Sequence, residues 1–270
     1  MPSSSPQPTV INSFDGIPLE GLLQAVTPSL GSVLLVHGFS VDMHEGGAFD
    51  RLAGRLGAAG VAVARVSFRG HGGSGGTQWG MTISGERLDL SAAYDWMTAE
   101  LRPPYGIIAA SFGAVATLLQ IHALTPSPCA VVLLNPVLEL FKVFVQPQSQ
   151  WGRENFGQAA RMRASAQGYV EVNRFKAGQV LLDEMTLFPE NLAISHLGGT
   201  PCLIVHGTED GHVPIESSRA AAVLDAVQLI EISGSGHGFS EPSAECHVFE
   251  LSTDWIARRL REDTQTLESR

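Results

Sequence analysis

The chain has 270 residues, of which 44% are hydrophobic, so it is long enough to bury a substantial core within one α/β domain. Its 17 basic and 27 acidic residues give a formal net charge of −10, and Lys and Arg form no cluster, which argues against nucleic acid or an anionic membrane as a partner. The first residues lack the pattern of a signal peptide, and no apolar run approaches the length of a membrane span, so we expect a cytoplasmic protein.

The cysteine pattern points to neither a disulfide framework nor a metal site. Cys129, Cys202 and Cys246 are few, widely separated and without metal-binding spacing. We interpret all three as small core residues, and we expect no metal and no other cofactor.

The chain opens with a tail and a predicted hairpin. Residues 1–8 are rich in Ser and Pro, which predicts disorder. The pair Asp15-Gly16 separates two strand-like runs, Thr9–Phe14 and Ile17–Val26, so the sheet should begin with two antiparallel strands. A continuous apolar run at Ser32–His37 is then typical of a strand that is covered on both faces.

Strands and helices alternate along most of the remaining chain. Apolar residues at helical spacing predict a helix around Phe49–Leu56 and a second helix with an apolar face formed by Leu88, Ala92, Trp96 and Ala99. Further strands are predicted at Val61–Phe68, Gly106–Ala110, Ala130–Leu134, Pro201–His206 and Val227–Ile232, and further helices after Ser111, at Pro214–Leu224 and from Ser243. The pattern predicts an α/β fold, a doubly wound and mostly parallel sheet of about eight strands flanked by helices.

Residues 136–199 break this alternation. The segment is far longer than a strand–helix–strand crossover requires, and aromatic residues are scattered through it. We interpret it as a cap or lid inserted into a core formed by residues 9–135 and 200–262. Its aromatic side chains could form the cap's own small core or line a substrate pocket, and we expect some to do each. A homodimer contact on the exposed side of the cap remains an open option.

One stretch places a serine on an abrupt turn between a strand and a helix. Such a turn lifts the serine hydroxyl clear of the backbone, where a base can reach it and where the first helix amides face a developing oxyanion. The motif usually written G-x-S-x-G reads Ala109-Ala110-Ser111-Phe112-Gly113. Alanine is the smallest departure from glycine at a place where strand and helix cross closely.

Polar residues also follow the neighbouring predicted strands. Gly38-Phe39 comes after one strand, Glu209-Asp210 after another, and His237 lies in a glycine-rich loop after a third. Sites in such sheets form outside the carboxyl ends of the strands, so these residues should meet Ser111. The chain order Ser, Asp, His is that of the α/β hydrolases.

The sequence resembles the α/β-hydrolase fold family from about Phe14 to Leu260. Four motifs carry the resemblance: VHGFS at Val36–Ser40, AASFG at Ala109–Gly113, HGTEDGHVP at His206–Pro214 and GSGHGF at Gly234–Phe239. Within the family, the RGHGGSGG loop at Arg69–Gly76 and the cap look most like the cinnamoyl/feruloyl esterases and related small serine esterases.

The resemblance implies a catalytic triad and an oxyanion hole. A serine hydroxyl is a poor nucleophile, so Ser111 would need His237 as its base, and Asp210 would orient the imidazole while Glu209 faces away. The backbone N–H groups of Phe39 and Phe112 are the expected oxyanion donors. Candidate pocket residues are Phe39, Phe144, Trp151 and Phe239. Three other histidines are interpreted as structural: His37 and His206 orient loops, and His71 stabilises its glycine-rich loop.

The function expected from these residues is that of a serine hydrolase, a carboxylic ester hydrolase that releases a small apolar or aromatic acyl group through an acyl-enzyme. Its partner would be a small-molecule ester. The same triad could instead cleave thioesters or amides, although no acidic pair is placed to bind a substrate amine, which disfavours an aminopeptidase. A non-hydrolytic small-ligand binding protein of the same fold, and a lyase or acyltransferase, remain open.

Overall fold

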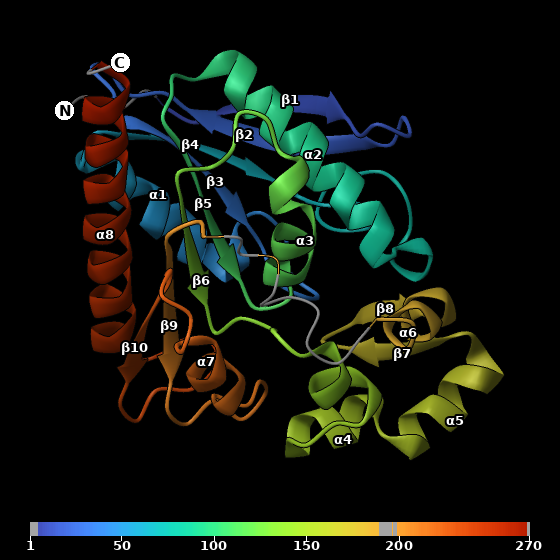
Figure 1. Cartoon of the computed structure of the whole chain (residues 1–270). Helices are drawn as coiled ribbons and strands as arrows, with labels where there is room; N and C mark the ends of the chain where they lie inside the picture. Colours follow the sequence, from blue (N-terminus) through green and yellow to red (C-terminus); the bar gives the residue numbers. More distant parts are fainter. Residues whose placement is uncertain (1–4, 189–195, 197–198, 269–270) are drawn as a thin grey trace.

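An eight-stranded sheet forms the centre of the computed structural model, which describes residues 5–188, 196 and 199–268 (Figure 1). The strand order is β1-β2-β4-β3-β5-β6-β9-β10. Of these, β1 (Gln7–Asn12) pairs antiparallel with β2 (Pro18–Gln24), which pairs antiparallel with β4 (Val61–Val66). All other pairs are parallel, between β3 (Gly31–Val36), β4, β5 (Tyr105–Ala110), β6 (Ala130–Leu134), β9 (Cys202–Gly207) and β10 (Val227–Ile232). The predicted fold class is confirmed.

The N-terminal strand begins earlier than predicted. Gln7 pairs with Leu23 and Pro8 with Leu22, so the prediction of a disordered tail over residues 1–8 is wrong at Gln7 and Pro8; residues 1–4 lie outside the described residues. Proline lacks a backbone N–H, but β1 is the edge strand of the sheet, where the missing donor leaves no ladder partner unpaired.

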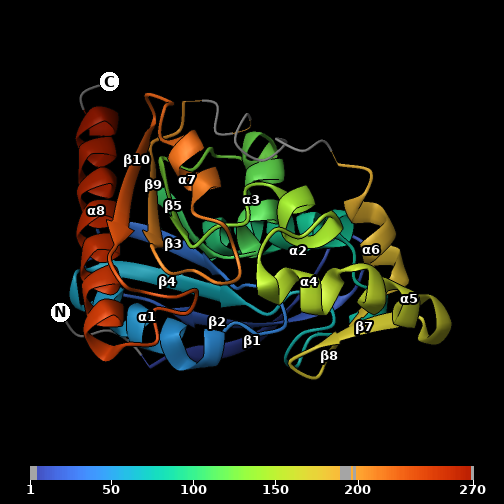
Figure 2. The ribbon, with the colours of Figure 1, turned by 90° about the horizontal axis from the view of Figure 1, so that it is seen from below.

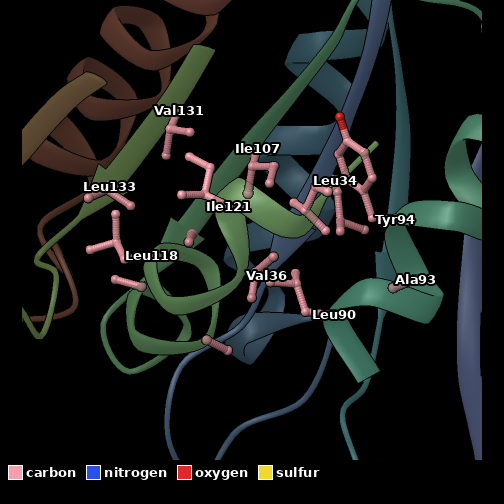
Figure 3. Close-up of a cluster of buried hydrophobic side chains, with 14 of the residues drawn as sticks. Leu34, Val36, Leu90, Ala93, Tyr94, Ile107, Leu118, Ile121, Val131 and Leu133 are labelled. Carbon is pink, nitrogen blue, oxygen red and sulfur yellow. The ribbon is translucent and has the colours of Figure 1, made fainter. Parts of the chain in front are cut away.

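Helices cover both faces of the sheet, and each side has its own apolar core. On one face lie α1 (Ala48–Ala58) and α8 (Pro242–Glu268); on the other lie α2 (Ile83–Glu100), α3 (Gly113–Gln120) and α7 (Glu216–Ala221) (Figures 1 and 2). Figure 3 shows the second core, in which Leu90, Ala93 and Tyr94 of α2 and Leu118 of α3 meet Leu34 and Ile107 of the sheet. The last helix extends to Glu268, beyond the predicted core boundary at residue 262.

The predicted apolar face of α2 is confirmed at Ala92, which is buried, and at Trp96, which packs against the core, but it is wrong at Leu88 and Ala99, which are exposed. Leu88 is 38% exposed, whereas Leu90, Ala93 and Met97 are fully buried. The reason is a buried acidic residue, Asp89, whose carboxylate accepts hydrogen bonds from the guanidinium of Arg69 at 2.7 and 2.9 Å. A buried charge needs a partner, so this pair turns Asp89 inward and rotates Leu88 outward.

The insertion, residues 136–199, has its own apolar core. It contains a π-helical turn (Phe141–Val145), α4 (Gln150–Phe156), α5 (Gln158–Gln167), the hairpin of β7 (Tyr169–Val172) and β8 (Phe175–Gly178), and α6 (Gln179–Met185). Its buried residues pack together and against Phe112 and Val115, which follow the carboxyl end of β5. These elements gather at the lower right of Figure 1 and form one group in Figure 2 as well. Short 3-10 turns lie at Glu45–Gly47, Gln78–Gly80 and Ile121–Ala123.

Candidate active site

Ser111 stands on the turn between β5 and α3 in a left-handed conformation, with φ of 49°. Such a backbone costs a residue other than glycine about 1–2 kcal/mol. The turn is held by hydrogen bonds from the Ser111 N–H to the Leu134 carbonyl (2.9 Å) and from the Val137 N–H to the Ser111 carbonyl (3.0 Å). The strained serine is therefore fixed on both sides by the end of β6 and the segment after it.

The two small residues that flank the turn differ in how strictly they are required. A Cβ on Gly113 would collide with the carbonyl oxygen of His37 and lie 2.9 Å from that of Val36, so only glycine fits. Ala109, which replaces the first glycine of the motif, is fully buried in β5 with its methyl group accommodated. The substitution at position 109 therefore leaves the turn intact.

The structure brings Ser111, His237 and Asp210 into one hydrogen-bonded series. The Oγ of Ser111 lies 2.9 Å from Nε2 of His237, and Nδ1 of the same ring lies 2.7 Å from Oδ2 of Asp210. Oδ1 of Asp210 accepts hydrogen bonds from the backbone N–H groups of His212 and Val213 at 2.8 and 2.9 Å. Glu209 is exposed. Of the two adjacent acids, only Asp210 contacts the histidine.

The carboxyl group of Asp210 stays ionised because of its hydrogen bonds. Burial alone would raise its pKa, but hydrogen bonds from His206 and His237 outweigh burial and hold the pKa well below its usual range. The ring of His206 is fully buried; its Nε2 faces Oδ2 of Asp210 at 3.3 Å, and its Nδ1 lies 2.8 Å from the hydroxyl of Ser218. His206 thus fixes the acid of the series as well as its own loop.

Asn135, which the sequence did not single out, joins the loops that carry Asp210 and His237. It follows β6 with φ of 43°, a conformation that asparagine tolerates better than most residues, and it is buried. Its Oδ1 accepts a hydrogen bond from the Gly207 N–H at 2.8 Å, and its Nδ2 donates to the carbonyl of His237. One buried side chain thus couples the carboxyl ends of two strands to the histidine loop.

Two backbone N–H groups lie near Ser111: that of Phe112, the next residue in the chain, and that of Phe39, which lines the same cavity as Ser111. Within the described part of the chain, neither the Phe39 nor the Phe112 N–H donates a hydrogen bond. The Gly38 carbonyl accepts a hydrogen bond from Nδ1 of His37 at 2.9 Å, while Nε2 of this ring accepts one from the Phe68 N–H at 2.9 Å. Because the carbonyl and N–H of a trans peptide point in opposite directions, His37 also sets the direction of the Phe39 N–H.

His37 is a neutral imidazole. Burial lowers the pKa of His37 to about 4. Neutrality agrees with its hydrogen bonds, since one ring nitrogen donates and the other accepts.

Two cavities meet at Ser111 and His237. The insertion-side cavity, of about 140 Å³, is lined on its apolar walls by Phe39, Val137, Val143, Phe144 and Trp151. The core-side cavity, of about 80 Å³, is lined on its apolar walls by Ala48, Phe49, Leu134, Phe239 and Phe249. The four predicted pocket residues thus divide between the cavities, with Phe239 alone on the core side. A larger hollow beside Val26 and Leu101, of about 500 Å³, has no histidine among its described lining residues.

Comparison with known proteins assigns the family. The sequence profile of the alpha/beta hydrolase family matches residues 33–247. The chain belongs to the alpha/beta hydrolase family. The resemblance inferred from the four motifs is thereby confirmed.

Solved structures of hydrolases share the fold of this alpha/beta hydrolase. An esterase from Pyrococcus furiosus is 19% identical, with 94% of this chain and 91% of that chain covered and a TM-score of 0.69. Est1E from Butyrivibrio proteoclasticus, solved with ferulic acid bound, is 18% identical, with 97% and 100% covered and a TM-score of 0.70. The alpha/beta hydrolase GrgF from Penicillium is 16% identical, with 96% and 99% covered and a TM-score of 0.73. None of the hydrolase's described helices is long and apolar enough to cross a membrane.

The hydrolase site also contains a histidine that the sequence left unassigned. The ring of His212 stacks on Trp151 of α4, with centroids 4.5 Å apart and planes 23° apart, and its centroid lies 4.7 Å from that of His237. Burial lowers the pKa of His212, so the ring favours its neutral form. Its position two residues after Asp210 was the one sequence signal that could have placed it here.

The aromatic residues of the insertion are divided between its apolar core and the insertion-side cavity. Phe156 and Phe175 belong to the core of the insertion, and both contact Phe39 with centroids 5.9 and 5.3 Å apart. Phe144 and Trp151 line the insertion-side cavity. The same cluster therefore stabilises the insertion and shapes one wall of the cavity.

Of the cysteines, Cys202 is buried, but Cys246 is exposed and its sulfur lies 2.8 Å from the guanidinium of Arg55. The interpretation of all three as core residues is wrong for Cys246, because position 246 falls on the outer side of α8.

Proposed function

We propose that this alpha/beta hydrolase is a serine esterase that cleaves carboxylic esters of small apolar or aromatic acyl groups through an acyl-enzyme. The observation that carries the proposal is the hydrogen-bonded series of Ser111, His237 and Asp210 at the point where two cavities meet. A serine that touches a base, which in turn touches a buried carboxylate, is the arrangement that nucleophilic acyl transfer requires.

In the proposed first step, Oγ of Ser111 attacks the ester carbonyl while Nε2 of His237 accepts the hydroxyl proton. The N–H groups of Phe39 and Phe112 would bind the oxyanion of the tetrahedral intermediate, since neither donates elsewhere in the described chain. The imidazolium of His237 then protonates the departing alkoxide, which leaves an acyl group on Ser111.

In the second step a water molecule takes the place of the alcohol. His237 removes a proton from the water, the resulting hydroxide attacks the acyl-enzyme, and the acid product leaves as Ser111 regains its proton. Asp210 would hold the Nδ1–H tautomer of His237 and stabilise its cationic form. The lowered pKa of Asp210 supports this role, because the carboxylate keeps its charge while His237 changes charge.

The two cavities suggest where the acyl part and the alcohol part of an ester would bind. An ester has an acyl part and an alcohol part on either side of its carbonyl, and Ser111 lines two cavities. Their apolar walls favour uncharged apolar or aromatic groups of modest size. We propose that the insertion acts as a cap, because Phe144 and Trp151 form the outer wall of one space.

The test combines covalent labelling with turnover. The protein is incubated with a fluorophosphonate probe and then assayed on aryl and alkyl esters of graded acyl length, with Ser111→Ala as the control. We expect labelling of Ser111 and ester hydrolysis, both lost in the variant. Absence of labelling together with ester turnover no higher than that of Ser111→Ala would overturn the proposal. Turnover confined to thioesters in the same assay would instead indicate a thioesterase.

A further inference from the structure

Glu45 places a carboxyl group where the two cavities meet, although it belongs to neither the hydrogen-bonded series nor the oxyanion donors. It lines both cavities together with Ser111 and His237. Its Oε2 accepts a hydrogen bond from the Gly38 N–H at 2.8 Å. A Cβ built on Gly38 would lie 3.1 Å from Cβ of Ser111 and 3.4 Å from Oε1 of Glu45, so the carboxyl group is a close neighbour of the serine.

The carboxyl group of Glu45 has acceptor capacity that the protein does not use. A carboxylate offers two oxygens with about four acceptor positions, and the Gly38 N–H occupies one. Among the described residues, Oε1 of Glu45 has no hydrogen-bond donor, and no Lys or Arg pairs with this side chain. Glu245, which lines the core-side cavity, is by contrast held by Arg51 at 2.5 and 2.7 Å.

The backbone that carries Glu45 is strained. Glu45, Gly46 and Gly47 have φ of 48°, 62° and 92°, three left-handed residues in succession. Glycine adopts this conformation freely, but glutamate does so at a cost of about 1–2 kcal/mol. Strain of this kind persists where the surroundings impose it and is concentrated at functional sites. Here the turn directs a carboxyl group inward instead of leaving it in solvent.

We infer that Glu45 is a specificity-determining residue, whose free oxygen accepts a hydrogen bond from a hydroxyl or protonated amine close to the scissile carbonyl of the substrate. The inference rests on the proposed esterase function and narrows its substrate class to esters that carry such a donor. The inference needs only this single acid, and so stands beside the expectation that no acidic pair is placed to bind a substrate amine. The apolar walls of the cavities would then hold the rest of each ester.

The test compares three ethyl esters that differ at one carbon: ethyl propionate and its 2-hydroxy and 2-amino derivatives. Each is assayed at about pH 7.5 with the unaltered protein, Glu45→Gln and Glu171→Gln, because burial raises the pKa of Glu45 to about 7 and its carboxyl group must be mostly ionised to act as the acceptor. Glutamine keeps an oxygen for the Gly38 N–H but presents an amide NH₂, a donor, in place of the free oxygen. Glu171 is exposed on β7, so its substitution removes the same charge away from the cavities.

The measured quantity is kcat/KM for each substituted ester divided by kcat/KM for ethyl propionate. The inherent reactivity of the esters cancels when this ratio is compared between proteins. We expect Glu45→Gln to lower the ratio about tenfold or more for at least one substituted ester, as the loss of a hydrogen bond to a charged group predicts, and Glu171→Gln to leave it unchanged. A larger loss for the amino ester than for the hydroxy ester would identify the donor as an ammonium group.

Glu45→Asp provides a second variant in case glutamine disturbs the turn. It keeps the charge but withdraws the carboxyl group from the cavities, so the ratio should fall here too. Ratios that change less than about twofold in both variants, with Ser111 still labelled by fluorophosphonate, would overturn the role of Glu45 and leave the esterase proposal standing. Absence of labelling in the unaltered protein would overturn the esterase proposal itself.

Discussion

At the scale of single residues, Gly113 carries the most stringent steric requirement of the turn around Ser111. A side chain there meets the carbonyl groups of Val36, the last residue of the neighbouring strand β3, and of His37 just after it, and these groups cannot move without disturbing the end of that strand. We expect Gly113→Ala to destabilise the fold by about 3 kcal/mol or more, the upper range for overpacking. Ala109→Gly should cost only about 1 kcal/mol, because it adds backbone freedom without a collision. Urea unfolding of both variants measures the difference, and equal losses would contradict the argument.

A second prediction at the residue scale concerns which of two adjacent acids, Glu209 or Asp210, orients His237. Asp210 contacts His237 and Glu209 is exposed. We therefore expect Asp210→Asn to lower kcat about 10⁴-fold, because an amide can neither hold the correct tautomer nor stabilise the imidazolium. Glu209→Gln should change kcat less than about twofold. The kcat values of both variants on one aryl ester decide the matter; the reverse order would assign the role to Glu209.

At the scale of elements, the contact between α4 and the loop after β9 links the insertion to the site. Trp151 stacks on His212, whose ring lies beside His237. Removing the indole enlarges the insertion-side cavity and ends a stacking interaction of about 0.5–1.5 kcal/mol. We expect Trp151→Ala to raise KM for short-chain esters about 2- to 10-fold and to shift the preference toward longer chains.

The control for this prediction is Trp79→Ala. Trp79 is 52% exposed and lies against Lys176, away from both cavities, so the same truncation should leave the chain-length preference unchanged. A Trp151→Ala profile that matches the Trp79→Ala profile across the ester series would show that α4 does not limit substrate size.

The elements that could be predicted from the sequence are those with a local signal. The strands β3, β5 and β6 are continuous apolar runs, and the turn at Ser111 has a local motif, so the sequence predicted these strands and this turn. The hairpin of β7 and β8 was missed, because short strands in an aromatic-rich insertion show no clear period. The buried face of α2 was predicted only in part, because the outward position of Leu88 depends on the pairing of Asp89 with Arg69, a contact between residues distant in the chain.

The site residues, too, fall into those that a local sequence pattern could predict and those that it could not. Asp210 and His237 stand in recognisable motifs after strands, whereas Glu45, Asn135 and His212 acquire their positions only from contacts made in three dimensions. A glutamate in a loop has no pattern that distinguishes an inward carboxyl group from a solvated one. The left-handed turn at residues 45–47 becomes visible only in the backbone.

At the scale of the whole molecule, buried ionisable groups make stability depend on pH in two opposing ways. Burial lowers the pKa of His37 to about 4 and of His71 to about 3, so the unfolded chain binds more protons than the folded one below about pH 6.5. These histidines contribute stability that is lost as the pH falls toward 4. Burial also raises the pKa of Glu45 to about 7 and of Glu86 well above its usual value. These acids contribute stability at low pH that is lost as the pH rises.

The two effects oppose each other between about pH 4.5 and 6.5, so we expect the free energy of unfolding to be greatest there and to decline above about pH 6.5 as the buried acids ionise. Each group contributes a slope of up to about 1.4 kcal/mol per pH unit.

The groups that face Glu45 are the Gly38 N–H and His237, which favour its charge, and Asp42, which opposes it. Urea unfolding across this pH range should show Glu45→Gln gaining stability relative to the unaltered protein as the pH rises, while Glu171→Gln gains none. Parallel curves for Glu45→Gln and the unaltered protein would mean that Glu45 is solvated like an ordinary surface acid. Its strained turn would then need another explanation.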